Sequence, residues 1–226
     1  MLPLRVHAPR STVPWVTWAL LVTNLLVFYY ELRVPPAYLS TALLPTYGLI
    51  PSRLTAFLGG SPAAPWSVLL PLLTSQFLHA GWLHVLGNMW MLFLFGDSVE
   101  DRLGHQGFAV FYLSCGLAAG LTQCLLQPHS TVPIIGASGA IAGVMGGFMM
   151  RHPRARVLTL IPLLFFWVVE LPAWVILGYW FFLQALSGST LLALRGASAE
   201  GGVAWFAHLG GFITGAFLLQ WWPTDP

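Results

Sequence analysis

Six apolar runs cover most of this chain, and they constrain its fold more than any other feature. They span residues 14–30, 77–95, 108–126, 138–150, 157–186 and 203–222. Most of them approach the roughly 20 residues that a helix needs to cross a lipid bilayer. Only 7% of all residues are charged, whereas a typical soluble domain has about 25%. The chain is therefore expected to be an integral membrane protein.

The runs predict an all-α polytopic membrane protein with six transmembrane helices, of which the fourth is short. Residues 1–13 are expected to form an N-terminal tail, residues 14–222 the six-helix domain, and residues 223–226 a short C-terminal tail. The first run is long for the apolar part of a signal peptide, and no clear small-residue cleavage site follows it. We therefore expect it to stay in place as the first helix.

Arginine placement predicts the orientation, because cytoplasmic loops are enriched in basic residues. With six spans, both termini and two loops share the side with more arginines, so both termini are expected to be cytoplasmic. That side carries Arg5, Arg10, Arg102, Arg151, Arg154 and Arg156, and the other carries Arg33, Arg53 and Arg195. A net charge of +2 gives no reason to expect nucleic acid as a partner.

The fourth run is too short to cross the membrane alone. Thirteen residues make about 20 Å of helix, whereas the hydrocarbon core is about 30 Å thick. The segment 128–137, which contains two prolines, must dip into the membrane to meet it. Irregular backbone at that depth needs surrounding protein or water, so we expect a wet cavity open to the outside with Ser138 at its floor.

Two further segments depart from simple spans. The fifth run is too long, and Glu170-Leu171-Pro172 interrupts it. We expect residues 157–170 to lie along the cytoplasmic interface and the fifth span to begin at Leu171. Residues 34–76 are apolar but broken by prolines and glycines, and they are expected to form a loop partly embedded in the outer leaflet.

Four polar side chains on three predicted spans fall at one depth, in the outer half of the bilayer. They are His84, Asn88, Ser138 and His208. His84 and Asn88 are four residues apart and share a helix face. Glycines repeat every four residues after Ser138 and after His208, and small-residue stripes allow two helices to pack closely. Close packing would bring Ser138 and His208 within hydrogen-bonding distance.

A serine and a histidine in contact can perform nucleophilic catalysis. His208 would take the proton of Ser138 as the hydroxyl attacks a carbonyl. The free N–H groups at the start of the fourth helix, with His84 and Asn88, would stabilise the developing oxyanion. No Asp or Glu lies at this depth on the three spans, so we predict a Ser–His dyad.

Each feature also has a plain structural interpretation. Glycines around Ser138 can serve helix packing, His208 can be a hydrogen-bonded core residue, and Asn88 can join two helices. Cys115 and Cys124 are expected to be packing residues. The histidine spacing does not suit a metal site, and we expect no metal or cofactor.

Several segments together resemble the rhomboid family of intramembrane serine proteases. The similar segments are 78–88 (LHAGWLHVLGN), 100–104 (EDRLG), 136–139 (GASG), 172–184 and 207–212 (AHLGGF). The resemblance covers roughly residues 14–222 and implies a six-helix core. It implies Ser138 as nucleophile, His208 as base, and His84, Asn88 and Gly136 in the oxyanion and substrate-binding region.

The resemblance also implies transmembrane protein substrates, cut near their outer ends, with Trp180 and Phe181 as candidates for a gate on the fifth span. We expect a cell membrane location, in a prokaryotic plasma membrane, with membrane lipid as the other partner. Two positions depart from the family pattern. Leu70-Pro71 replaces a Trp-Arg pair, and Ala142 replaces an aromatic residue that stacks on the histidine in some members.

Two other classes compete with the protease. A transporter would show internal repeats and helices broken at the midplane, and the sequence shows no repeat. A non-catalytic rhomboid-like protein that binds transmembrane clients is the main alternative. Such proteins usually lack the serine or the histidine, and both are present here.

Overall fold

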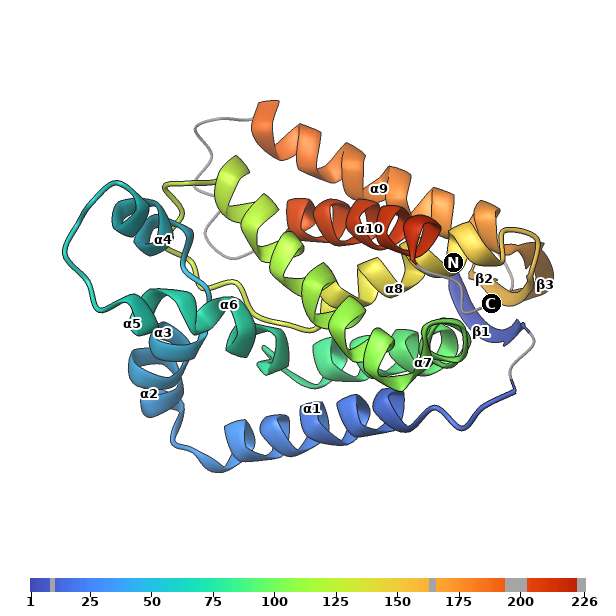
Figure 1. The fold of residues 1–226 in the computed structure, drawn as a ribbon, viewed down its shortest axis with the longest axis horizontal. Coiled ribbons are helices and arrows are strands. Elements are labelled where there is room, and N and C mark those ends of the chain that lie inside the picture. Colours follow the sequence, from blue (N-terminus) through green and yellow to red (C-terminus); the bar gives the residue numbers. More distant parts are fainter. Residues whose placement is uncertain (9–10, 163–165, 194–202, 223–226) are drawn as a thin grey trace.

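The computed structural model describes residues 1–8, 11–162, 166–193 and 203–222, and helices dominate it. Figure 1 shows α8 and α10 crossing the centre of the molecule, α7 wrapping around them, and α1 and α9 on opposite sides. The bounds of these elements are α1 Trp15–Arg33, α7 Trp82–Leu126, α8 Ser138–Arg151, α9 Ala173–Ala193 and α10 Trp205–Trp221.

Within the described chain, α1 and α7 are long and apolar enough to cross a membrane. Helix α7 has 45 residues and contains one non-helical position, Gly104, with φ 68° and ψ 165°. Glycine adopts such a positive φ without steric cost. The second and third predicted runs lie on two helical arms that meet at the kink at Gly104, where a longer loop between the runs was expected. The count of six spans, their orientation and the domain boundaries stay predictions.

The start of α1 is held by two acidic residues just before this bend. The buried Glu100 carboxylate accepts hydrogen bonds from the backbone N–H groups of Val16 at 2.8 Å and Thr17 at 2.7 Å. It also accepts one from the Thr17 hydroxyl at 2.7 Å. The first N–H groups of a helix have no partner within it, so Glu100 satisfies two of them. The next residue, Asp101, accepts bonds from Ser11 and Thr12.

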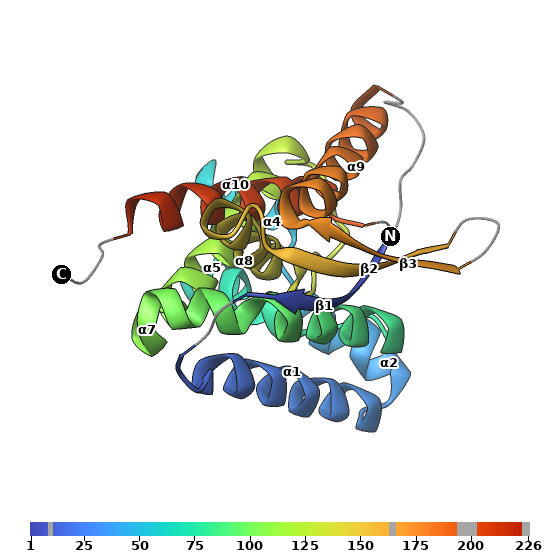
Figure 2. The same cartoon turned by 90° about the vertical axis from the view of Figure 1, so that its right-hand side faces the viewer.

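The expected all-α class is wrong at one end of the molecule, where three antiparallel strands form a small sheet. The strands are β1 Leu2–His7, β2 Arg156–Pro162 and β3 Phe166–Pro172, in the order β1-β2-β3. Figure 2 shows the β2–β3 hairpin projecting from the helices, with β1 beside it. The fifth helix begins at Ala173, two residues later than predicted.

The physical reason lies in the apolar run itself. A short run of buried residues has no periodicity that separates a strand from a helix. Here β-branched and aromatic residues are frequent, and they favour strands. Pro162 and Pro172 mark the ends of the two strands. Residues 2–7, expected in a tail, supply the third strand by pairing with β2.

The proline-rich segment 34–76 forms a series of short helical turns, in keeping with a loop too broken to span. Proline occupies the first position of four of them, which suits its fixed φ and missing N–H. The turns are α2 Pro36–Tyr38, η1 Leu39–Leu43, α3 Leu44–Tyr47, α4 Pro51–Leu58, α5 Pro65–Leu69, α6 Pro71–Thr74 and η2 Ser75–Phe77.

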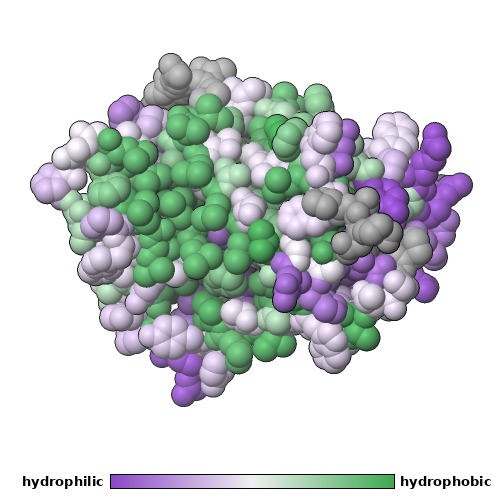
Figure 3. Space-filling model, in the orientation of Figure 1, coloured by the Kyte–Doolittle hydropathy of each residue, from purple (hydrophilic) through white to green (hydrophobic). Residues whose placement is uncertain are grey.

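Large apolar side chains cover much of the outer surface. Figure 3 shows hydrophobic residues across most of one face, with hydrophilic residues gathered at the edge that bears the sheet. Leu26 on α1, Phe93 on α7 and Phe217 on α10 are each more than half exposed. Soluble proteins rarely expose apolar patches this extensive. The surface fits a protein whose helices contact lipid.

Helices α8 and α10 pack backbone against backbone through glycines. A methyl group at Gly211 would overlap the carbonyl of Gly139, and one at Gly215 would overlap the backbone of Gly143. The predicted stripes of small residues therefore do bring these two helices together. This contact also sets the distance between the two helices that carry Ser138 and His208.

We expect Gly215→Ala to push α8 and α10 apart and to destabilise the protein by about 1–3 kcal/mol, the usual cost of overpacking a core. Thermal unfolding in detergent measures the change. Gly178→Ala on α9 is the matched control, because a methyl group there meets nothing within 4 Å. The control should unfold at or slightly above the parent temperature. Equal unfolding temperatures for both variants would contradict close packing of α8 on α10.

Candidate active site

The structure places Ser138 and His208 in direct contact, although they are 70 residues apart in sequence. The Ser138 Oγ lies 2.8 Å from the His208 Nε2, the distance of a good hydrogen bond. His208 is 8% exposed, and Ser138 is half-buried. A hydroxyl and an imidazole are therefore adjacent, and the residue that carries the hydroxyl is partly exposed.

Local structure explains why these two residues meet. Ser138 is the first residue of α8, as predicted, and the helix ends after 14 residues at Arg151. His208 lies in the first turn of α10, which begins at Trp205. The Gln123 Oε1 on α7 accepts the backbone N–H of Ala207 at 3.0 Å. This bond ties the start of α10 to α7 beside Ser138.

A third polar residue, Gln184 on α9, contacts the histidine. Its Oε1 lies 2.8 Å from the His208 Nδ1, and Gln184 is 7% exposed. The side chain at this position is a neutral amide and not a carboxylate. Sequence reasoning gave Gln184 no role. The available signal was a lone amide in the otherwise apolar centre of α9.

An aromatic ring from α9 also packs on the histidine. The Trp180 and His208 ring centroids are 5.6 Å apart, with 40° between the planes. Some family members stack an aromatic ring on this histidine from the position of Ala142 on α8, and alanine cannot supply such a ring. The Trp180 side chain contacts the site from α9 instead.

His84, Asn88 and Gly136 gather beside Ser138. A methyl group placed on Gly136 would lie 2.6 Å from the His84 Nε2 and 3.6 Å from the Asn88 Nδ2. The Nδ2 of Asn88 is buried and has no hydrogen-bond partner. A buried donor without a partner costs free energy, unless a ligand supplies the acceptor. Asn88 therefore offers a free donor near Gly136, two residues before Ser138.

The neutral His84 ring also presents a donor here. Its Nδ1 accepts the backbone N–H of Ala80 at 3.3 Å, so in the neutral ring the hydrogen is on Nε2, the atom near Gly136. The segment that leads into His84 is fixed in turn by Glu31 of α1. The Glu31 carboxylate accepts the backbone N–H of His79 at 3.1 Å and 3.2 Å.

The role of Gly136 is in the backbone geometry, not in donating a hydrogen bond to a ligand. Its N–H donates to the Ser75 carbonyl at 2.9 Å, so it is not free for a ligand. Its φ of +121° and the nearby His84 ring leave no room for a side chain. A glycine here lets the chain approach His84 and turn into α8. The irregular segment before it is paired as well, since Leu49 and Ile134 exchange two backbone hydrogen bonds.

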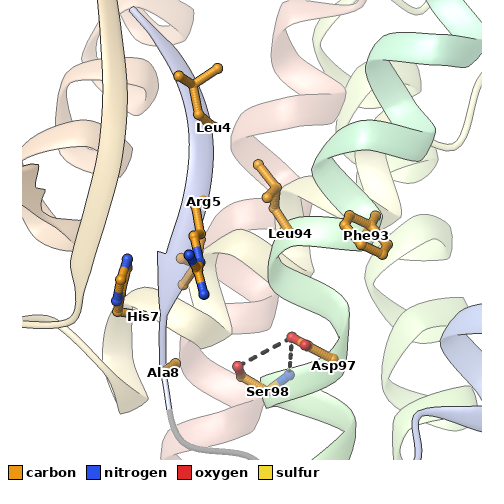
Figure 4. A pocket seen from close by; sticks show the side chains of 9 residues that line it. Leu4, Arg5, His7, Ala8, Phe93, Leu94, Asp97 and Ser98 are labelled. Carbon is orange, nitrogen blue, oxygen red and sulfur yellow. Dashed lines mark hydrogen bonds between the residues drawn. The ribbon is translucent and has the colours of Figure 1, made fainter. Parts of the chain in front are cut away.

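A separate cavity of 520 Å³ lies between β1 and α7, well away from the dyad. Figure 4 shows Arg5 and His7 on one side and Asp97 and Ser98 on the other. Asp97 is 13 residues after His84 on α7, which is about 20 Å along the helix. The lining residues are Leu4, Arg5, Val6, His7, Ala8, Phe93, Leu94, Asp97 and Ser98. The dyad does not contribute to this cavity.

No group of three or more histidine, cysteine, aspartate or glutamate side chains that could hold a metal ion is found in the described part of the chain. The His79 and His84 rings are close, with centroids 5.0 Å apart, but the backbone N–H of Ala80 occupies one nitrogen of His84. Cys115 and Cys124 are buried and free.

A comparison with known protein families identifies the family of this chain. The rhomboid domain family matches residues 66–221, which is more than half of the chain and contains Ser138, His208, His84, Asn88 and Gln184. The chain belongs to the rhomboid family. The resemblance expected from the sequence segments is therefore confirmed.

Individual rhomboid relatives are distant and mostly longer. RHOMBOID-like protein 6, mitochondrial, from Arabidopsis thaliana is 26% identical over 92% of this chain and 70% of its own length. Rhomboid protein 1, mitochondrial, from Saccharomyces cerevisiae is 32% identical over 68% of this chain and 41% of its own. Rhomboid-like protein 11, chloroplastic, from Arabidopsis thaliana is 39% identical over 31% of this chain and 25% of its own. This rhomboid chain thus spans less than half the length of two of these three relatives.

These relatives correct the expected location. Two of them are mitochondrial proteins by name and the third is chloroplastic. The predicted prokaryotic plasma membrane is wrong on this finding. Arginine placement alone cannot tell one membrane from another, because the same basic excess orients helices wherever they are inserted.

Proposed function

We propose that this rhomboid chain is a serine endopeptidase that cleaves transmembrane proteins within the membrane through Ser138 and His208. The hydrogen bond of 2.8 Å between the Ser138 Oγ and the His208 Nε2 carries the proposal. Buried polar groups in a membrane protein are costly and usually functional. Here the contact also has the geometry that general-base activation of a hydroxyl needs.

The reaction follows from the positions of these atoms. His208 Nε2 takes the Ser138 hydroxyl proton while Oγ bonds to the scissile carbonyl carbon and the carbonyl oxygen becomes an oxyanion. The C–N bond then breaks, and His208 passes the proton to the leaving amine, which leaves an ester on Ser138. Water attacks this ester with His208 again as base, and His208 then passes the proton to the Ser138 Oγ as the ester C–O bond breaks and the acid is released.

Three kinds of donor support an oxyanion site next to Ser138. These are the free N–H groups at the start of α8, the Asn88 Nδ2 and the His84 Nε2. The positive end of the α8 dipole acts in the same direction. Preorganised donors of this kind stabilise the transition state more than the bound substrate.

The substrate class follows from where Ser138 lies. A segment that reaches Ser138 must expose its carbonyl, and an intact helix hides its carbonyls in internal hydrogen bonds. We therefore propose transmembrane substrates cut near the end that faces the start of α8, at small or helix-breaking residues. The names of the relatives favour a mitochondrial membrane as the location.

Reconstitution into proteoliposomes with a single-span model substrate tests this function. The wild type should release two fragments, and Ser138→Ala should bind the substrate and leave it intact. The competing function, binding of transmembrane clients without cleavage, predicts equal binding by both proteins and no fragments from either.

Asn88→Ala should lower the cleavage rate by about 10²-fold to 10³-fold, the typical loss of one oxyanion donor. The effect should fall on kcat, because the donor acts chiefly in the transition state. Kinetics at varied substrate density in the bilayer separate kcat from KM. Asn24→Ala on α1 is a suitable comparison, since Asn24 is a buried amide bonded to the Leu20 carbonyl and lies outside the site. A change in KM alone would make Asn88 a packing residue.

A further inference from the structure

The amide of Gln184 faces the side of the catalytic histidine that is turned away from the serine. The Gln184 Oε1 is 2.8 Å from Nδ1 and the Ser138 Oγ is 2.8 Å from Nε2. Both ring nitrogens are thus engaged, by residues of two different helices. We propose that Gln184 is a positioning residue that holds His208 in the tautomer with its hydrogen on Nδ1. This inference rests on the proposed protease function for its consequence, but the tautomer can be measured without activity.

The tautomer decides whether the dyad can work. A neutral histidine carries one hydrogen, and the hydrogen bond at one nitrogen sets the role of the other. The carbonyl oxygen of Gln184 accepts the hydrogen of Nδ1, which leaves a lone pair on Nε2. That lone pair is what receives the Ser138 proton. If the hydrogen were on Nε2, the histidine would donate to the serine and could not act as its base.

The position of α9 explains how the amide is held. Leu177, Trp180, Gln184 and Gly188 are three or four residues apart, so they share one helix face. That face packs on α10, where Phe181 and Phe212 have ring centroids 4.8 Å apart. At Gly188 a methyl group would lie 2.8 Å from the Phe206 ring. The contacts of Phe181 before Gln184 and of Gly188 after it thus hold the Gln184 amide against His208.

This arrangement makes the base depend on a helix that carries neither reacting group. Ser138 lies on α8 and His208 on α10, and their contact is set by the glycines between those helices. The tautomer is set by α9. A displacement of α9 from α10 would break the bond to Nδ1 and remove the Trp180 contact together. Ser138 and His208 are therefore correctly arranged for catalysis only when α9 packs against α10.

The first test measures the tautomer directly. Protein labelled with ¹⁵N-histidine in detergent micelles should show His208 with a protonated Nδ1 and an unprotonated Nε2, assigned from the signals lost in His208→Ala. In Gln184→Met, which removes the acceptor and keeps the length of the side chain, this preference should disappear. A His208 protonated on Nε2 in the wild type, or an unchanged spectrum in Gln184→Met, overturns the proposal.

The second test measures the consequence at Ser138 with a fluorophosphonate probe. Gln184→Met should react about 5-fold to 100-fold more slowly, the loss expected from one buried hydrogen bond. Gln184→Glu should keep an acceptor for Nδ1–H, and its negative charge should stabilise the protonated imidazole. The protonated ring is inactive as a base, so the acid limb of the pH–rate profile should move to higher pH. Loss of packing alone would not move that limb.

Ser189→Ala is the matched control on the same helix, because Ser189 is exposed and its hydroxyl donates to the Leu186 carbonyl. It should match the wild type in both tests. A wild type with the expected tautomer and no probe reaction refutes the protease and leaves the positioning role standing. Probe reaction at the wild-type rate and an unmoved pH profile in both Gln184 variants refutes the positioning role and leaves the protease standing.

Discussion

Ser138→Ala and His208→Ala are each expected to reduce cleavage of a transmembrane substrate by about 10⁴-fold or more. Residues that act as one catalytic unit lose most of the rate when any of them is removed. The 2.8 Å contact makes these two such a unit. Initial rates in proteoliposomes at saturating substrate measure the loss.

The double variant provides the sharper comparison. If Ser138 and His208 work only together, Ser138→Ala with His208→Ala should be no slower than Ser138→Ala alone. Ser138→Ala should unfold near the wild-type temperature, because Ser138 is half-buried. His208→Ala should unfold at a lower temperature, because the buried Gln184 amide loses its partner. Losses that multiply in the double variant would mean that the two residues act independently, in conflict with a dyad.

Glu100→Ala should produce the largest loss of stability among the substitutions considered, about 3 kcal/mol. The Glu100 carboxylate is fully buried and accepts three bonds from Val16 and Thr17 at the start of α1. Its removal leaves these donors without partners, and each unsatisfied buried donor costs about 1–3 kcal/mol. Partial relaxation of the helix start recovers part of that cost. The unfolding midpoint in detergent measures the change.

Asp101→Ala is the neighbouring control for this prediction. Its partners Ser11 and Thr12 are exposed, so water replaces the lost hydrogen bonds and the loss should stay near 1 kcal/mol or below. Equal losses in the two variants would mean that burial of Glu100 does not decide the stability of the α1 start.

The contact between Ser138 and His208 could be predicted from the sequence because its signals are local and chemical. The glycine-flanked Ser138 at the start of a short apolar helix and the lone His208 on another are costly polar groups in a membrane protein. The glycine stripes gave the reason why their helices approach, and the structure shows that approach at Gly215 and Gly211. The comparisons confirm the family, while the catalytic roles stay a proposal.

Gln184 could not be assigned from the sequence because its partner is set by the packing of α9. A single amide in an apolar helix can face lipid, another helix or a site with equal ease. Only the aromatic contacts of Phe181 and Trp180 with α10 fix which face of α9 turns inward. The pairing of the Gly136 N–H with the Ser75 carbonyl could not be predicted for a similar reason, since Ser75 comes from a distant segment.

The sheet escaped prediction because β1 and β2 are about 150 residues apart in the chain. Strand pairing over such a separation leaves no short-range pattern, and the apolar run that contains β2 and β3 suits a helix or a strand equally. Gly104 shows the opposite case. A single residue with positive φ joins the two helical arms of α7, where a longer loop was expected between two predicted spans.

The most direct test of the account is the mass of the intact protein after reaction with a fluorophosphonate. The probe needs a nucleophilic serine and no substrate. Ser138 Oγ bonds to phosphorus, fluoride leaves, and His208 takes the proton. The account predicts one adduct on the wild type, mapped to Ser138, and none on His208→Ala. A folded wild type that stays unmodified, or an adduct of equal yield on His208→Ala, would contradict the claim that Ser138 and His208 form a working dyad.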